Sequence, residues 1–362
     1  MRFQGLDLLR AAAILLVLGR HFEKALEDYA PIHAAPFLEA WRHGGWVGVD
    51  LFFALSGFLI GNLLVTEWRK TGSIRPGRFL ARRAWKIVPP LYLMLGLTVA
   101  LRCTFRPLAV VAREALVDAA FLTNYLLGAW AHTWSLALEA HFYLLLTLVA
   151  AWLLRGRQRL GPFVWTLAGL AALVLAIRAC FPATGEPMSQ QYFFLEFPTH
   201  RRIDSLLIGA LLACAYSTEA IRARAARIDA HWYLLVGMAF LAPAFWISDR
   251  LFLGSPLGFT WIQAGTSSLV AWALLKAPTP GFLAASAAAL GRHSYCIYLF
   301  HYPLFGLWAK LRTRFHWDHV YLELMTVSVL VVGVGVAISL LWEAPLLRLR
   351  ERFFPATPAR TI

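Results

Sequence analysis

The stretch that decides the fold is GLDLLRAAAILLVLGRHFEKA, residues 5–25. A helix of about 20 residues crosses the hydrocarbon core of a bilayer, yet Asp7, Arg10 and His21 lie within or beside this apolar run. A charged group at the bilayer centre costs about 2.5–3.5 kcal/mol, so such groups usually have a function. The same stretch could pass for a secretory signal peptide, but no small-residue cleavage pattern follows it. We therefore predict a retained first membrane helix.

The composition extends this interpretation to the whole chain. Of its 362 residues, 59% are hydrophobic and only 15% are charged, whereas soluble domains carry about 25% charge. Several further runs are apolar over about 18 residues or more, which predicts an all-α polytopic membrane protein with about ten transmembrane helices. An amphipathic helix over 108–128 is expected to lie at the outer face or to insert partly, without forming a full span. The expected spans are residues 5–24, 46–66, 87–102, 134–154, 162–180, 203–217, 232–248, 257–275, 292–310 and 321–343.

The basic residues indicate how the chain is oriented. The net charge is +14, and Lys and Arg concentrate in 69–86, 155–159, 222–227 and 348–352. Positive charge favours the cytoplasmic side, so both termini are expected there. The same bias explains the charge without a nucleic-acid partner. We expect one lipid-embedded domain, 1–350, with a short basic tail, 351–362.

Arg10 and His21 share one face of the first helix. Eleven steps of about 100° return to within about 20° of the starting direction, and the two residues are separated by about 16 Å along the axis. Asp7 lies one turn before Arg10, close enough to pair with it. An Arg that reaches the membrane interface and a solvated His is the alternative interpretation. An imidazole near neutral pH is also the commonest proton shuttle or general base.

The next two spans add packing and charge features. Asp50 and Ser56 are polar in the second span, and Gly57 and Gly61 form a G-x-x-x-G pattern typical of close helix packing. Before the third span, one helical face carries three cations, Arg78, Arg82 and Lys86. Arg83 lies beside this face. Such a face suits either lipid headgroups or a phosphorylated ligand from the cytosol.

Glu139 is the acidic residue of the fourth span, in HTWSLALE. It lies five residues after Trp134, about 7–8 Å below the outer boundary. That depth is similar to the depth expected for His21, so its carboxylate could orient the imidazole or hold its proton. Later spans contribute Arg202, and also Tyr298 and His301, which lie one turn apart and could line the same cavity.

These segments, in this order, resemble the acyltransferase-3 family of integral membrane acyltransferases. The resemblance runs from about Gly5 to Arg348. Its blocks are the Arg10-x10-His21 pair, VDLFFALSGFLI, the Arg82–Arg83 pair before VPPLY, HTWSLALE, RIDSLLIGALLA and SYCIYLFHYPL. Ala140 and His141 stand where many relatives have a second Glu followed by Gln or His, so the two-carboxylate arrangement of those relatives is not expected here. Some relatives also carry an appended esterase-like domain, which we do not expect.

The resemblance implies transfer of an acyl group, usually acetyl, from cytosolic acyl-CoA to a hydroxyl. Acyl-CoA would be a co-substrate, with no permanently bound cofactor and no metal. Acceptors would be surface glycans or lipid-linked sugars at the bacterial inner membrane, with glycan-synthesis enzymes as further partners. The catalytic set would be His21, Glu139 and Arg10, and the donor-binding set Arg82, Arg83 and Arg10. Cavity or substrate residues would be Asp7, Ser56, Trp134, Ser135, Arg202, Tyr298 and His301.

Two other functions fit membrane-embedded Arg, His and Glu. One is a transporter or flippase for a lipid-linked sugar, although the chain shows no inverted repeat and no matching pair of broken helices. The other is a membrane scaffold for glycan synthesis, for which the charged spans would tolerate substitution.

Overall fold

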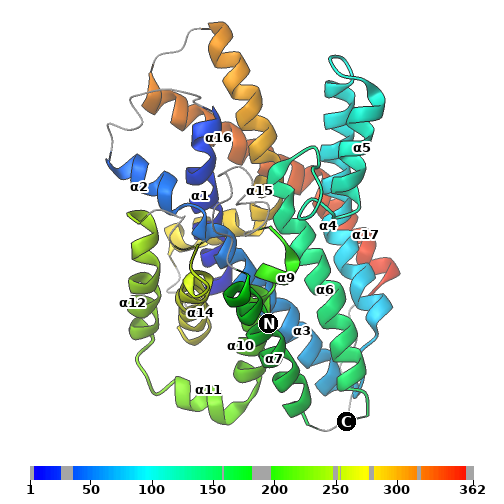
Figure 1. The fold of residues 1–362 in the computed structure, drawn as a ribbon, viewed down its shortest axis with the longest axis vertical. Helices are drawn as coiled ribbons and strands as arrows, with labels where there is room; N and C mark the ends of the chain where they lie inside the picture. The colour runs from blue at the N-terminus through cyan, green and yellow to red at the C-terminus, as the bar shows by residue number, and fades with distance from the viewer. Residues whose placement is uncertain are drawn as a thin grey trace. The chain divides into compact units, whose positions relative to one another are not determined.

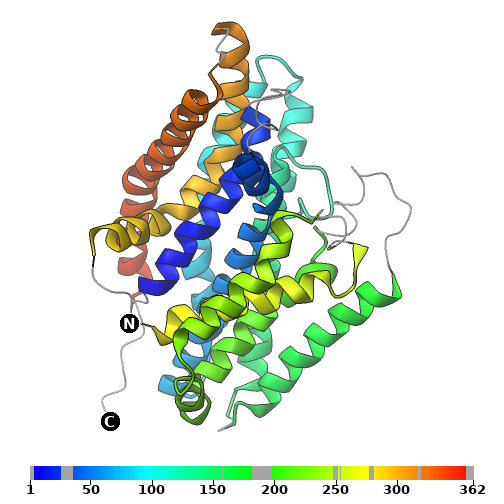
Figure 2. The same cartoon turned by 90° about the vertical axis from the view of Figure 1, so that its left-hand side faces the viewer.

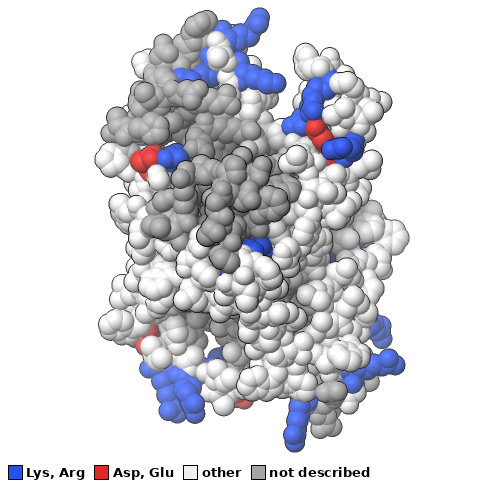
Figure 3. Space-filling view, viewed as in Figure 1, with Lys and Arg blue, Asp and Glu red and all other residues white. Residues whose placement is uncertain are grey.

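A computed structural model describes residues 4–25, 36–156, 159–181, 197–247, 252, 254–276, 281–315 and 319–355. The described residues form helices and no strand (Figure 1). This confirms the predicted all-α class. Phe105, Trp152, Trp165 and Leu341 are each more than 75% exposed, which is costly in water and favourable in lipid. Few Lys, Arg, Asp or Glu side chains interrupt the described surface seen in Figure 3, as in an integral membrane protein.

Five helical segments are long and apolar enough to cross a membrane, or six if one bent pair forms a single span. The bent pair joins 204–217 to 219–225 at an angle of 97°. The first helix is 22 residues long, but Asp7, Arg10 and Arg20 interrupt it, which keeps it out of this set. The predicted count of ten and the orientation of the termini remain predictions. The five segments are Val47–Thr71, Pro76–Arg102, Ala131–Leu153, Gly161–Cys180 and Tyr321–Phe353.

The chain divides into two compact units, each described by itself. Unit 1 comprises residues 1–52, 230–252 and 264–342. It contains the first turns of α3 (Val47–Thr71) and most of α14 (Gly258–Leu275). Its other helices are α1 (Gln4–Ala25), α2 (Pro36–Gly44), α12 (Ala230–Leu241), η4 (Ala242–Phe245), α15 (Phe282–Phe315) and α16 (Val320–Ile338), followed by the π-helical turn η5 (Ser339–Glu343).

In unit 1, α1 packs along α15, as both ribbon views show (Figures 1 and 2). Their backbones approach closely at Gly291, where a Cβ would overlap the carbonyl oxygen of Asp7. On the other side of α15, a Cβ at Gly335 of α16 would come within 2.7 Å of Ile297. Small residues therefore seat α15 between two neighbours, as is common among membrane helices.

Unit 2 comprises residues 53–229, 253–263 and 343–362. It takes the remainder of α3 and the first turns of α14. Its other helices are α4 (Pro76–Arg102), α5 (Leu108–Ala119), η2 (Ala131–Thr133), α6 (Trp134–Leu153), α7 (Gly161–Cys180), α9 (Thr199–Arg202), α10 (Asp204–Ser217), α11 (Glu219–Ala225) and α17 (Ala344–Phe353).

The two glycines of the G-x-x-x-G pattern pack α3 against α10 within unit 2. A Cβ at Gly57 would overlap the Leu206 carbonyl, and one at Gly61 would lie 2.9 Å from the Cα of Ala210. Gly209 of α10 faces back, since its Cβ would lie 2.5 Å from the Ala54 carbonyl oxygen. The predicted packing role is confirmed.

The predicted amphipathic helix over 108–128 is too long. The α5 helix ends at Ala119, and Phe121 has a positive φ of 57°, which a right-handed helix does not allow. The Asp118 carboxylate accepts hydrogen bonds from the Ala129 amide and the Thr133 hydroxyl, each at 2.6 Å. These bonds hold the chain after α5 in a closed loop instead of a continuing helix.

The predicted tail boundary at residue 351 falls inside a helix, because α17 continues to Phe353. The predicted span 321–343 lies within the continuous apolar segment Tyr321–Phe353, in which α16 passes after Ile338 into the π-helical turn η5 and then into α17. Residues 356–362 of the expected tail lie outside the described part of the chain.

Candidate active site

Asp7 and Arg10 form the ion pair predicted at the start of α1. Arg10 Nη1 lies 2.9 Å from Asp7 Oδ1. The Asp7 side chain is buried at 7% exposure, whereas that of Arg10 is 29% exposed. The i,i+3 spacing is sufficient to bring the two groups together. Part of the Arg10 side chain therefore remains accessible while Asp7 balances its charge.

His21, near the other end of α1, is hydrogen-bonded to His301 of α15. The distance from His21 Nδ1 to His301 Nε2 is 3.0 Å. The second ring nitrogen of His301, Nδ1, is hydrogen-bonded to the backbone carbonyl of Tyr298. His301 is completely buried, while His21 is half-buried. The structure thus brings together two residues predicted for the site from opposite ends of the chain.

Aromatic side chains surround this histidine pair within unit 1. Tyr302 contacts His21 edge-on, with ring centroids 5.2 Å apart and planes at 89°. Tyr298 and Phe305 contact His301 at 5.4 and 5.8 Å. These contacts restrict the rotation of both imidazoles. The sequence interpretation included Tyr298 but missed Tyr302, which adjoins His301 in the chain and was not singled out.

In unit 2, Glu139 of α6 accepts two hydroxyl hydrogen bonds. Ser56 Oγ donates to Glu139 Oε1 at 2.8 Å, and Tyr143 donates to Oε2 at 2.9 Å. The charge of Arg83 on α4 acts on the Tyr143 hydroxyl. Ser56 and Glu139 were predicted site residues, whereas Tyr143 was missed. Its position four residues after Glu139, on the same helical face, is the signal that could have found it.

Glu139 and His21 belong to different units. Each has a hydrogen-bonding partner in its own unit: His301 for His21, and Ser56 and Tyr143 for Glu139. The predicted pairing of the Glu139 carboxylate with the His21 imidazole therefore stays a prediction.

Trp134 and Arg202 lie against the same phenylalanine of α3. The Trp134 indole contacts Phe53 edge-on at 5.8 Å and stacks on Phe197 at 4.7 Å. The Arg202 guanidinium lies 5.8 Å from the Phe53 ring and 3.7 Å from that of Phe259. Arg202 is fully buried and donates to Ser205 at 3.3 Å. These two predicted cavity residues form an aromatic and cationic cluster within unit 2.

The predicted site residue Ser135 has a local contact instead. Its hydroxyl donates to the His132 carbonyl at 3.3 Å. A hydrogen bond to the turn before α6 is typical of serine at a helix start.

A buried ion pair near Arg202 was missed by the sequence interpretation. Arg178 Nη2 of α7 donates to Asp204 Oδ2 of α10 at 2.7 Å, and both side chains are at most 3% exposed. Arg178 also donates to the carbonyls of Arg201 and Pro256 at 2.9 and 3.2 Å. A single Arg near the end of an apolar span resembles an interfacial residue, so its buried partner could not be read from spacing.

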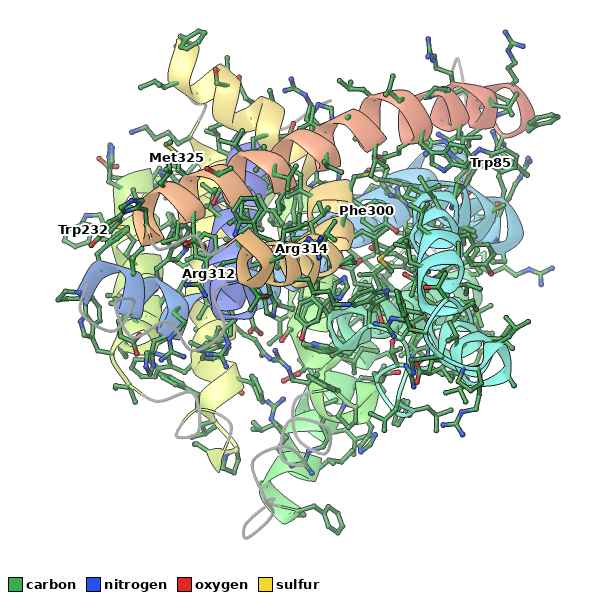
Figure 4. The ribbon with its side chains drawn as sticks, turned by 90° about the horizontal axis from the view of Figure 1, so that it is seen from above. Trp85, Trp232, Phe300, Arg312, Arg314 and Met325 are labelled. Atoms are coloured by element: carbon green, nitrogen blue, oxygen red, sulfur yellow. The ribbon has the colours of Figure 1, made fainter. Side chains whose placement is uncertain are left out.

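Arg82, a predicted donor-binding residue of α4, and its neighbours Arg78 and Trp85 contact α17 and the two residues that follow it. Arg82 pairs with Glu351 at 2.9 Å and also donates to the Phe354 carbonyl. Arg78 donates to the Pro355 carbonyl. The indole of Trp85, labelled in Figure 4, donates to the Leu346 carbonyl at 2.7 Å. Arg82 and Arg83 are neighbours in the chain but have different contacts. Arg82 is bound to α17, whereas the charge of Arg83 acts on Tyr143.

Comparison with known proteins bears directly on these features. A family model that describes an acyltransferase domain matches residues 3–343, which include both the α1 histidine and the α6 glutamate. The chain belongs to the acyltransferase-3 family. No solved structure matches the chain significantly.

Curated relatives are similar to most of the chain. The chain is 26% identical over 323 residues to the O-acetyltransferase OatA of Staphylococcus aureus, covering 83% of this chain and 50% of that protein. It is 27% identical over 333 residues to the peptidoglycan O-acetyltransferase OatA of Listeria monocytogenes, covering 84% of this chain and 49% of the relative. The chain thus spans about half the length of these relatives.

Proposed function

We propose that the protein is a membrane O-acyltransferase that moves an acyl group, most simply acetyl, from cytosolic acyl-CoA to a hydroxyl of a cell-surface glycan or lipid-linked sugar. The observation that carries the proposal is a hydrogen-bonded imidazole on the first helix of an acyltransferase-3 chain. Two relatives named as O-acetyltransferases support the acetyl group. One of them is named for peptidoglycan, which supports a glycan acceptor in the cell envelope. The location that we propose with this function is the bacterial inner (cytoplasmic) membrane, where the protein would have access to cytosolic acyl-CoA.

The reaction exchanges a thioester for an oxygen ester. The acceptor oxygen bonds to the acyl carbon, the carbon–sulfur bond breaks, and the hydroxyl proton is finally carried by the released CoA thiol. His21 as general base would take that proton as the oxygen attacks and deliver it to the sulfur. A positioned base contributes about 10²–10⁴-fold to such a step.

A second route uses His21 as acyl carrier. The imidazole nitrogen attacks the thioester, the carbon–sulfur bond breaks and CoA leaves as the thiolate. The acceptor oxygen then bonds to the acyl carbon, the carbon–nitrogen bond breaks, and the hydroxyl proton ends on the CoA thiolate. Both routes need an unprotonated ring nitrogen on His21. They differ in whether an acyl-histidine forms.

The donor is a polyanion, and cations of α1 and α4 suit its phosphates. Arg10 is neutralised in part by Asp7 but remains 29% exposed. Arg83 lies close enough to Tyr143 for its charge to act there. Arg82 would have to exchange Glu351 for a phosphate, a replacement of one charge-assisted hydrogen bond by another. Glu139, with its two hydroxyl donors, would hold or orient the polar acceptor.

The decisive experiment is acyl transfer by the purified full-length protein in detergent or nanodiscs. Incubation with labelled acetyl-CoA and fragments of envelope glycan should move label to the glycan. His21→Ala should abolish this transfer, whereas His231→Ala, a histidine on α12 that interacts with Lys276, should not. Full transfer by His21→Ala would remove His21 from the mechanism.

The same purified protein, reconstituted in proteoliposomes, distinguishes the transporter alternative from the enzyme proposal. Proteoliposomes that move a lipid-linked sugar without acyl-CoA, and that transfer no label, would overturn the enzyme proposal. Rapid mixing with labelled acetyl-CoA alone, followed by quenching in denaturant at neutral pH, also separates the two routes, because labelled acyl-histidine would form on the protein only if His21 is the carrier.

A further inference from the structure

The hydrogen bonds around His301 determine which nitrogen of that ring carries the proton. Its Nδ1 is bonded to the Tyr298 backbone carbonyl, and a carbonyl oxygen can only accept. Nδ1 must therefore be the N–H donor. A neutral imidazole has one N–H and one lone pair, so Nε2 of His301 is an acceptor.

This assignment passes to His21 across the 3.0 Å contact. His301 Nε2 faces His21 Nδ1, and two lone pairs at that distance would repel each other. His21 must donate from Nδ1, which leaves the lone pair of its neutral ring on Nε2. A fixed backbone carbonyl thus determines the tautomer of a side chain on another helix, through one intervening ring.

We propose that His301 is a positioning residue that holds His21 in the tautomer with an unprotonated Nε2, the nitrogen that performs the chemistry. The proposal rests on the function proposed above and holds for both the base and the carrier route. His301 takes the place that a carboxylate occupies in a Ser-His-Asp triad, where the third group sets the tautomer of the catalytic histidine.

The packing of the pair supports a positioning role. His301 is fully buried and its ring is enclosed by Tyr298 and Phe305. His21 contacts Tyr302 edge-on at 5.2 Å. Rings held in this way keep the Nδ1–Nε2 hydrogen bond aligned, so little reorganisation is needed when His21 Nε2 gains a proton or an acyl group. In either event, the Nδ1–H of the resulting cationic ring continues to donate to His301.

Two substitutions distinguish the effect of the hydrogen-bond acceptor on His301 from the effect of the volume of its side chain. His301→Gln keeps an amide oxygen near the position of Nε2, and His301→Phe keeps a ring but has no acceptor. His301→Phe should lower kcat on the order of 100-fold with little change in the KM for acetyl-CoA. His301→Gln should remain within about tenfold of wild type. Equal losses in the two variants would overturn the proposal. His293→Phe, on the same helix and bonded to Ser339, is the control for a ring substitution on α15.

A second measurement does not depend on activity. In ¹⁵N-histidine-labelled full-length protein, assigned by comparison with His21→Gln, the chemical shifts of His21 should report a protonated Nδ1 and an unprotonated Nε2. The same pattern should persist in His301→Gln and become mixed in His301→Phe. A protonated Nε2 in the wild type would refute the positioning role. Absence of acyl transfer by the wild type would instead refute the proposed function and leave the tautomer measurement standing.

Discussion

Arg82 of α4 and Glu351 of α17 form a bidentate ion pair, in which Nη1 donates to Oε2 at 3.1 Å and Nη2 donates to Oε1 at 2.9 Å. In this pair, the Glu351 carboxylate of α17 neutralises Arg82, a cation that we propose binds acyl-CoA. Both side chains are partly exposed, at 24% and 44%, so a phosphate from solution can compete with Glu351.

Removing the Glu351 charge should strengthen donor binding. An exposed ion pair contributes about 1 kcal/mol at most, so Glu351→Gln should lower the KM for acetyl-CoA by up to about fivefold, with the effect shrinking at high salt. Steady-state kinetics at two ionic strengths measure this. Glu219→Gln, at the exposed start of α11, is the matched control. An unchanged or raised KM would mean that Arg82 serves to anchor α17.

The Tyr143 hydroxyl should contribute to both stability and activity through its hydrogen bond to Glu139. Tyr143→Phe removes a donor from a carboxylate without changing the ring, at a cost of about 1.5–3 kcal/mol in the free energy of unfolding. Thermal unfolding in detergent should show a lowered Tm, and the kcat for transfer should fall as well. Tyr92→Phe on the exposed side of α4 should change neither. A Tyr143→Phe variant with wild-type Tm and kcat would show that the hydrogen bond to Glu139 is dispensable.

The Arg178–Asp204 pair should be essential for the stability of unit 2. Asp204→Asn leaves a buried guanidinium without its counter-charge, which costs about 3–5 kcal/mol. Equilibrium unfolding of the full chain measures the loss. Glu114→Gln removes the charge from the more exposed pairs with Arg102 and Arg106, and it should cost less than the Asp204 substitution, at most about 1 kcal/mol for each pair. Comparable losses in the two variants would contradict the importance of burial.

The stability of the loop after α5 should depend on pH. Burial raises the pKa of the Asp118 carboxyl from 3.8 to about 6, against the lowering effect of hydrogen bonds from Thr133 and the Ala129 and Trp130 amides and of the Arg102 charge. Because the folded state binds this proton more tightly than the unfolded state, the stabilisation is complete below pH 3.8 and is lost as pH rises through about 6. The Tm should thus rise between about pH 7.5 and pH 5.

Asp118→Asn isolates this contribution from the other groups that titrate. The variant should lack the part of the pH dependence that Asp118 supplies, so its Tm should change less than the wild-type Tm over the same interval. Glu219→Gln should retain the wild-type slope. Parallel slopes for Asp118→Asn and the wild type would show that the carboxyl titrates at its ordinary pKa.

Local spacing along single helices was predictable from the sequence. Asp7 and Arg10 pair because three residues make nearly one helical turn, and the glycines at 57 and 61 pack because four residues make about one turn. The excess of apolar residues predicted helices throughout, since only a helix satisfies its own backbone hydrogen bonds in lipid. His21 and Glu139 stood out as ionisable residues of apolar spans, and the family blocks supported them as site residues. The ends of helices were harder to predict. The end of α5, for example, is set by hydrogen bonds to Asp118 from Ala129 and Thr133, which lie more than ten residues further along the chain.

The partners of those residues depended on tertiary structure. His21 meets His301 across 280 residues, Arg82 meets Glu351 across 269, and Ser56 meets Glu139 across 83. Helical periodicity specifies which side of its own helix a residue occupies, but not which helix lies opposite. That choice depends on where small residues let two backbones approach, as Gly291 does against Asp7. The sequence by itself determined that α1 carries an imidazole on the same face as a cation. Only the packing of α1 against α15 decided that a second imidazole, held by a backbone carbonyl, faces it.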